Sequence, residues 1–152
     1  MKDENQEYVT IRLAGQLLGI PVLAVHDVLN SQNITHIPMA PAWVAGVLNL
    51  RGRIVTAIDL RQRLGLPAIE KKQGSKNSMS IVVEHRGEPY SLIIDRVGEV
   101  LTLNMSDYEK NPVTLDPRWG EISSGIFRLE KELMVVLDVR RLLEFERQSL
   151  AA

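Results

Sequence analysis

Apolar and polar side chains alternate along most of the chain, in short segments separated by turns that contain glycine, proline or charged residues. From Val9 to Leu13, for example, every second side chain is apolar, which is the period of a strand with one buried face. The alternation predicts an all-β protein. We expect strands over 8–13, 17–22, 25–29, 79–84, 90–95 and 97–103, and hairpins over 46–60 and 125–138.

Helical signals are confined to short segments. Pro41 favours a single helical turn over 42–45, and Asp59 is a candidate N-cap for a short helix over 60–64 that Gly65 ends. The apolar spacing over 139–149 predicts a C-terminal helix. The polar stretch 67–78 is expected to be a linker or exposed loop, and the proline-containing stretch 104–120 is expected to be irregular.

The hairpin over 46–60 is the clearest local structure, because two apolar, β-branched runs flank Arg51 and Gly52. An Arg-Gly pair is a weaker turn signal than Asn-Gly or Asp-Gly, but it supplies the glycine that tight hairpin turns require. The second hairpin, over 125–138, is expected to turn near Glu130 and Lys131.

The two hairpins belong to an internal repeat. When Gly15 is placed on Gly87, an offset of 87 − 15 = 72, the apolar positions of residues 20–29 match those of 92–101. When Gly46 is placed on Gly125, an offset of 125 − 46 = 79, Asp59 meets Asp138. The chain thus consists of two units of roughly 60 residues and five strands each, and such a unit is too small to bury much surface alone.

Five short strands in each unit predict two small barrels, which also removes exposed strand edges. We place the domain at 8–145, with the two barrels at about 8–66 and 79–145, leave open an exchange of strands between them, and expect 1–7 to be a flexible tail.

Composition narrows the class of function. The chain has 152 residues, no cysteine and a formal net charge of −1, which excludes thiol chemistry and disfavours binding to a phosphate backbone. No apolar run approaches the ~20 residues of a membrane span, and the N-terminus lacks the apolar core of a signal peptide. We therefore expect a cytoplasmic protein.

Candidate catalytic groups are sparse. The three histidines have no metal-ligand spacing, and neither a Gly-x-Ser-x-Gly motif nor a phosphate-binding glycine loop is present in the sequence. Because Asp59 and Asp138 are equivalent in the repeat, helix capping is preferred over paired-carboxylate catalysis. We expect no enzyme activity, cofactor or metal.

Residues that differ between the two units are the better functional candidates. Arg51 corresponds to Glu130, and Asn49 corresponds to Arg128. A turn arginine is most simply a solvated charge, but the asymmetry favours a specific ion pair, either to a partner or across the barrels. Asp27 is open to the same two interpretations.

The first hairpin and its flanks strongly resemble the signature of the CheW family of chemotaxis adaptors. The matching residues are Pro38, Pro41, Trp43, Val44, Gly46, Val47, Asn49, Leu50, Arg51, Gly52, Ile54, Val55, Ile58, Asp59, Leu60 and Arg61. Val25, Asp27 and the segments 94–100 and 137–138 resemble other parts of the family, so that the likeness covers about residues 8–145.

The resemblance implies two intertwined five-stranded barrels of SH3-like type, with short helices. It also implies a non-catalytic adaptor that couples methyl-accepting chemoreceptors to the regulatory domain of a CheA-type histidine kinase within membrane receptor arrays. An apolar groove between the barrels would take the tip of the receptor's helical hairpin. The partner-binding set is predicted as Val25, Asp27, Asn49, Arg51, Gly52 and Val100. A small barrel that binds nucleic acid is the alternative.

Overall fold

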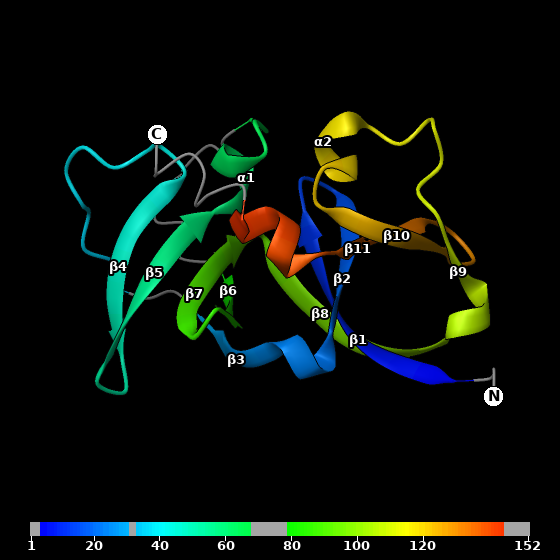
Figure 1. Cartoon of the computed structure of the whole chain (residues 1–152), viewed down its shortest axis with the longest axis horizontal. Coiled ribbons are helices and arrows are strands. Elements are labelled where there is room, and N and C mark those ends of the chain that lie inside the picture. The colour runs from blue at the N-terminus through cyan, green and yellow to red at the C-terminus, as the bar shows by residue number, and fades with distance from the viewer. Residues whose placement is uncertain (1–3, 31–32, 68–78, 145–152) are drawn as a thin grey trace.

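The chain folds into two small, strongly curved sheets that lie side by side (Figure 1). A computed structural model describes residues 4–30, 33–67 and 79–144. The all-β prediction with two barrels and short helices is confirmed, with one difference: one sheet has five strands and the other has six. No helix in the described ranges is both long and apolar enough to cross a membrane.

The five-stranded sheet has the order β3-β6-β7-β5-β4. Its strands are β3 (Val25–Leu29), β4 (Val44–Leu50), β5 (Arg53–Asp59), β6 (Met79–His85) and β7 (Glu88–Ile94). The six-stranded sheet has the order β8-β1-β2-β11-β10-β9. Its strands are β1 (Asn5–Leu13), β2 (Gln16–Pro21), β8 (Arg96–Asn104), β9 (Tyr108–Glu109), β10 (Ser123–Arg128) and β11 (Leu133–Leu137).

Helical segments occupy the ends and corners of the strands. They are the single-turn 3₁₀ helices η1 (Val22–Ala24) and η2 (Met105–Asp107), the short helices α1 (Leu60–Arg63) and α2 (Pro117–Gly120), and a helix over 139–144. Asp59 caps α1 by accepting hydrogen bonds from the backbone N–H groups of Arg61 and Gln62, and Asp138 accepts one from Arg141 N. The predicted capping role of both aspartates is confirmed.

Each sheet contains strands from both halves of the sequence. The β1–β2 hairpin lies in the six-stranded sheet beside β8 and β11, whereas the β6–β7 hairpin lies in the five-stranded sheet beside β3 and β5. The exchange is symmetric, because β5 pairs in parallel with β7 just as β11 pairs in parallel with β2. Neither half therefore completes a sheet by itself.

Buried side chains join the two sheets into one body. The largest apolar cluster draws on both, with Ile11 and Ile20 from the six-stranded sheet and Ile81 and Leu92 from the five-stranded sheet, all with no exposed surface. Two smaller clusters each belong to a single sheet. The two sheets therefore pack against each other through a shared core.

Close packing explains the glycines that match in the repeat. Gly46 and Gly125 each lie at an irregularity in the strand register. A Cβ added at Gly46 would lie 2.1 Å from the carbonyl oxygen of Thr35, and one at Gly125 would lie 2.3 Å from the ring of Tyr108. Both positions require glycine because another segment crosses there.

Some expectations need correction. Residues 5–7, expected in a flexible tail, belong to β1, because they pair in register with residues 102–104 of β8. The segment 42–45 is no helix, since only a reverse turn precedes β4. The stretch 104–120, expected to be irregular, contains η2, β9 and α2. The predicted tail residues 1–3, most of the predicted linker (68–78) and the end of the predicted C-terminal helix (145–149) lie outside the described residues.

Candidate functional site

The turn between β4 and β5 is built by Asn49 and Gly52. Arg51 and Gly52 have φ values of 51° and 86°, the left-handed pair that suits a two-residue hairpin. The side-chain oxygen of Asn49 accepts a hydrogen bond from Gly52 N at 3.0 Å. A Cβ at Gly52 would meet nothing within 4 Å, so glycine is needed there for its backbone conformation alone. These two residues shape the turn and project Arg51.

Arg51 reaches across to Asp27 in β3. Its guanidinium donates to the carboxylate at 2.6 Å, and the other carboxylate oxygen accepts from Val28 N at 2.9 Å. β3 and β4 are the terminal strands of the five-stranded sheet, so the ion pair links the two ends of that sheet. Among the predicted residues, the structure therefore brings Asp27 into direct contact with Arg51, in addition to the Asn49–Gly52 contact within the turn.

The ion pair lies at the surface. Arg51 is 73% exposed and the Asp27 side chain 23%. The hydrogen bond from Arg51 lowers the pKa of the Asp27 carboxyl, against a smaller effect of burial, and the bond from Val28 N adds to the lowering. An exposed ion pair contributes at most ~1 kcal/mol to folding. Its main physical effect is to fix the orientation of an accessible guanidinium.

A hollow of about 200 Å³ lies beside the ion pair. Its lining includes the buried residues Val55, Val82 and Val83 and the charged residues Arg53 and Glu84. All of its lining residues belong to the five-stranded sheet and the β4–β5 turn. This groove therefore lies on one barrel, whereas the resemblance led us to expect an apolar groove between the barrels.

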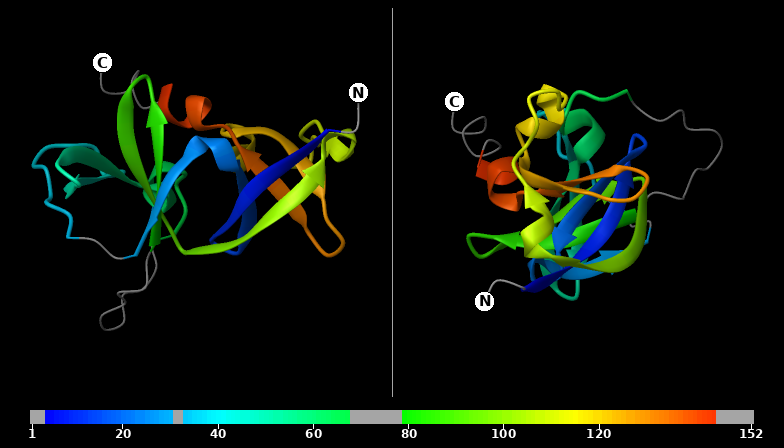
Figure 2. Two further views of the ribbon diagram at one scale, coloured as in Figure 1. Left: turned by 90° about the horizontal axis from the view of Figure 1, so that it is seen from below. Right: turned by 90° about the vertical axis from the view of Figure 1, so that its right-hand side faces the viewer.

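Val25 and Val100 lie on the strands that follow the two crossings of the chain between the sheets. β3 follows the crossing through η1, and β8 follows the crossing at Asp95 (Figures 1 and 2). Val25 is half-buried against the shared core, while Val100 is 52% exposed. The structure thus places Val25 on the sheet of Arg51 and Val100 on the other sheet.

The structure also exposes apolar residues that the sequence reasoning missed. Leu23 in η1 is 93% exposed, Ile54 beside Arg53 is 63% exposed, and Val28 beside Asp27 is 41% exposed. Exposed apolar side chains near a fixed charge are a common feature of protein-binding surfaces. The signal in the sequence was that β3 carries apolar residues on both of its faces, at Val25 and Val28.

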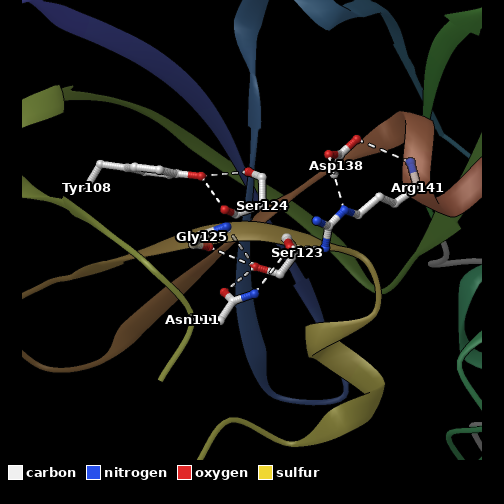
Figure 3. Close-up of polar contacts among 7 residues, drawn as sticks. All are labelled: Tyr108, Asn111, Ser123, Ser124, Gly125, Asp138 and Arg141. Carbon is white, nitrogen blue, oxygen red and sulfur yellow. Dashed lines mark hydrogen bonds and ion pairs between the residues drawn. The ribbon is translucent and has the colours of Figure 1, made fainter. Parts of the chain in front are cut away.

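In the six-stranded barrel, a polar network surrounds the base of the β10–β11 hairpin (Figure 3). Ser123 is fully buried; its hydroxyl donates to Asn111, and its carbonyl accepts from Asn111 and from Arg141. The hydroxyl of Tyr108 donates to the carbonyl of Ser124. These bonds tie the segment before β10, β10 itself and the C-terminal helix together, which is a structural role.

The described residues do not support a metal centre. No group of three or more histidine, cysteine, aspartate or glutamate side chains is arranged to hold an ion in the described ranges. Several charged side chains instead pair with one another, as Arg12 does with Glu132 and Arg128 with Glu109.

Comparison with known proteins gives a consistent result. A sequence model of the CheW-like domain matches residues 7–147. The chemotaxis protein CheW of Treponema pallidum is 29% identical to the chain over 153 residues, covering 99% of this chain and 90% of that protein. The chemotaxis protein CheW of Helicobacter pylori is 30% identical over 148 residues, covering 94% and 87%.

A solved structure shows the same fold. The crystal structure of the scaffolding protein CheW from Thermoanaerobacter tengcongensis superposes with a TM-score of 0.81 at 31% sequence identity, over 93% of this chain and 94% of that one. Sequence and fold agree over nearly the full length: the chain belongs to the CheW-like domain family.

Proposed function

We propose that the protein is a non-catalytic adaptor that couples methyl-accepting chemoreceptors to a CheA-type histidine kinase in chemotaxis-like signalling. The observation that carries the proposal is the exposed Arg51 of the first hairpin, held by Asp27 of β3, in a chain of the CheW-like family. The relatives are named as chemotaxis and scaffolding proteins, which supports an adaptor.

The surface around the pair suits a protein partner. Arg51 offers an oriented cation, and Val28 and Ile54 offer exposed apolar contact nearby in sequence. A receptor's helical hairpin could supply a carboxylate for Arg51 and apolar side chains for its surroundings. In this proposal Asp27 and Arg51 contact the partner or transmit its binding, Asn49 and Gly52 hold the turn, and Val25 and Val100 extend the surface.

The proposed setting is the cytoplasmic face of a membrane receptor array. Single contacts of such an adaptor are expected to be weak, with interfaces near or below ~1,200 Å². Repetition of the contacts within an array raises the effective concentration of each partner and supplies the overall strength.

Nothing in the described residues favours binding to nucleic acid. The chain carries a formal net charge of −1. Many of its arginines are already paired with its own carboxylates, which leaves few of them to displace counterions from a phosphate backbone. The paired arginines are Arg12, Arg51, Arg61, Arg86, Arg118, Arg128 and Arg141.

Reconstitution tests the adaptor role. A CheA-type kinase and receptor cytoplasmic fragments on vesicles are assayed for phosphorylation with and without the protein. We expect kinase activity to rise at least about tenfold when the protein is added, and to fall back with Asp27→Arg, which reverses the charge facing Arg51. The same kinase level with and without the wild-type protein would contradict the proposal.

A second experiment tests the alternative function, binding to nucleic acid. Filter binding with single-stranded oligonucleotides at low salt is expected to show no retention, since a net-neutral surface gains little from counterion release. Tight, salt-sensitive retention would favour the nucleic-acid alternative instead.

A further inference from the structure

The two crossings between the sheets are built differently. The first runs through η1, where Leu23 is 93% exposed. The second runs through Asp95, between the end of β7 and the start of β8. Asp95 is the repeat equivalent of Leu23, because 95 − 72 = 23. A carboxylate therefore replaces an exposed apolar side chain at one of two equivalent crossings.

Asp95 is bonded both to the β1–β2 hairpin and to helix α1. Its backbone N–H donates to the carbonyl of Arg12 at 3.1 Å, and its carboxylate accepts from Ala14 N at 2.9 Å, both in the β1–β2 hairpin. The same carboxylate accepts two hydrogen bonds from Arg61 of α1, at 3.0 and 2.6 Å. A single side chain thus connects the six-stranded sheet to the helix that follows β5.

The contact has the features of a rigid clamp. The Arg61–Asp95 pair is bidentate, and the remaining arm of Arg61 donates to the carbonyl of Pro67 at 2.6 Å. The two side chains are only 17% and 24% exposed. No other arginine–carboxylate pair among the described residues has both partners below a quarter exposed. Planar, two-point contacts fix orientation better than single charge contacts do.

The clamp connects the two parts of the proposed partner surface. Arg61 follows β5, the strand that leaves the Arg51 turn, and Asp95 directly precedes β8, the strand that carries Val100. We infer that Arg61 and Asp95 are positioning residues, which hold the two barrels in the arrangement that presents Arg51 and Val100 to one partner. The inference rests on the proposed function only where kinase activation is measured; the distance measurement requires no partner.

Distances between the barrels test the inference without any partner. The chain has no cysteine, so Ile54→Cys in β5 and Thr102→Cys in β8, both exposed, can carry spin labels on opposite sheets. Pulsed electron resonance on the labelled full chain is expected to give a single narrow distance distribution. With Asp95→Asn or Arg61→Lys we expect a distribution at least about 1.5-fold wider or shifted, because each substitution removes the two-point contact.

Controls distinguish positioning from general loss of structure. Glu132→Gln removes the Arg12–Glu132 pair, which is also bidentate but lies within the six-stranded barrel. It should leave both the distance distribution and kinase activation unchanged. The exchanged double variant Arg61→Asp with Asp95→Arg should narrow the distribution again. If Asp95→Asn fails to fold, Arg61→Lys, which keeps the charge, takes its place.

Two outcomes would overturn the inference. One is a distance distribution in Asp95→Asn and Arg61→Lys that has the same width and the same mean distance as in the parent chain. The other is a widened distribution with receptor-dependent kinase activation within about twofold of the parent, measured without labels. If the parent chain itself activates no kinase, the proposed function fails while the distance result still decides whether the clamp sets the arrangement of the barrels.

Discussion

The β4–β5 and β10–β11 hairpins share a scaffold but present different surfaces. Both carry a glycine where another segment crosses the strand, and both are followed by an aspartate that caps a helix. At the first hairpin Arg51 reaches to Asp27 and remains 73% exposed. Repetition thus identifies the architectural residues, and the positions at which the copies differ are the candidates for function.

The second hairpin is held by ion pairs and hydrogen bonds to neighbouring segments of the six-stranded barrel. Arg128 pairs with Glu109 of β9, and Glu132 at the turn pairs with Arg12 of β1. The polar network around Ser123 fixes the base of the same hairpin. Under the proposed function, the first hairpin meets a partner, whereas these contacts hold the second hairpin within its own barrel.

The largest effect is expected where the two hairpins are alike. Gly46→Val and Gly125→Val each place a side chain against a crossing segment, and Gly46 also has a φ of 146°. We expect each to lower the free energy of unfolding by about 3 kcal/mol or more. Urea unfolding measures the free energy of unfolding of each variant. A decrease below about 1 kcal/mol at either glycine would mean that the close packing at these glycines is not the feature that the two repeat units share.

A smaller effect is expected at the turn residues that only the first hairpin has. Asn49→Ala removes the hydrogen bond to Gly52 N and should cost about 1 kcal/mol of stability. Arg128→Ala, at the equivalent position of the second hairpin, removes an exposed ion pair and should cost less than about 0.5 kcal/mol. Equal decreases in the free energy of unfolding, measured with urea, would show that the two positions contribute equally to stability.

Acid should weaken the clamp between the barrels. Burial alone would raise the pKa of Asp95, but the hydrogen bonds from Arg61 and Ala14 N outweigh it and the net pKa is lowered from 3.8. A carboxyl with a lowered pKa stabilises the fold above its unfolded-state value, and this contribution is lost as the pH falls through the folded value.

The corresponding measurement is the unfolding free energy as a function of pH. Below about pH 4 the wild type should lose stability more steeply than Asp95→Asn, which has no carboxyl to protonate. Glu132→Gln is the matched comparison, because the bond to Arg12 also lowers the pKa of Glu132, although at an exposed site. Parallel curves for wild type and Asp95→Asn would mean that the clamp adds nothing to stability.

Much of the fold follows from local pattern. The alternation of apolar and polar residues predicts the strands, glycines predict the turns, and Asp59 and Asp138 predict where helices begin. Each of these signals acts within a few residues. The exchange of β1–β2 and β6–β7 could not be derived in this way. Alternation shows that a strand has a buried face but does not identify the strand beside it.

The contacts of the candidate site also divide into those between residues close in sequence and those between distant residues. Gly52 was predicted as a turn residue, whereas Asn49 was predicted only as a partner-binding residue, although its contact with Gly52 spans just three positions. The contact of Arg51 with Asp27 spans 24 positions, and that of Arg61 with Asp95 spans 34. Comparing the two repeat units singled out Arg51, because its equivalent is glutamate. It missed Arg61, because the equivalent residue is also an arginine, Arg140.

Under the proposed function, the first hairpin, and not the second, meets the receptor. The most direct test is receptor-fragment binding measured side by side for Arg51→Glu and Arg128→Glu, two charge reversals of exposed hairpin arginines. We predict at least about tenfold weaker binding for Arg51→Glu, binding within about twofold of wild type for Arg128→Glu, and near-native unfolding free energies for both. Equal binding by the two variants, or a greater loss with Arg128→Glu, would show that the first hairpin is not the receptor-binding one.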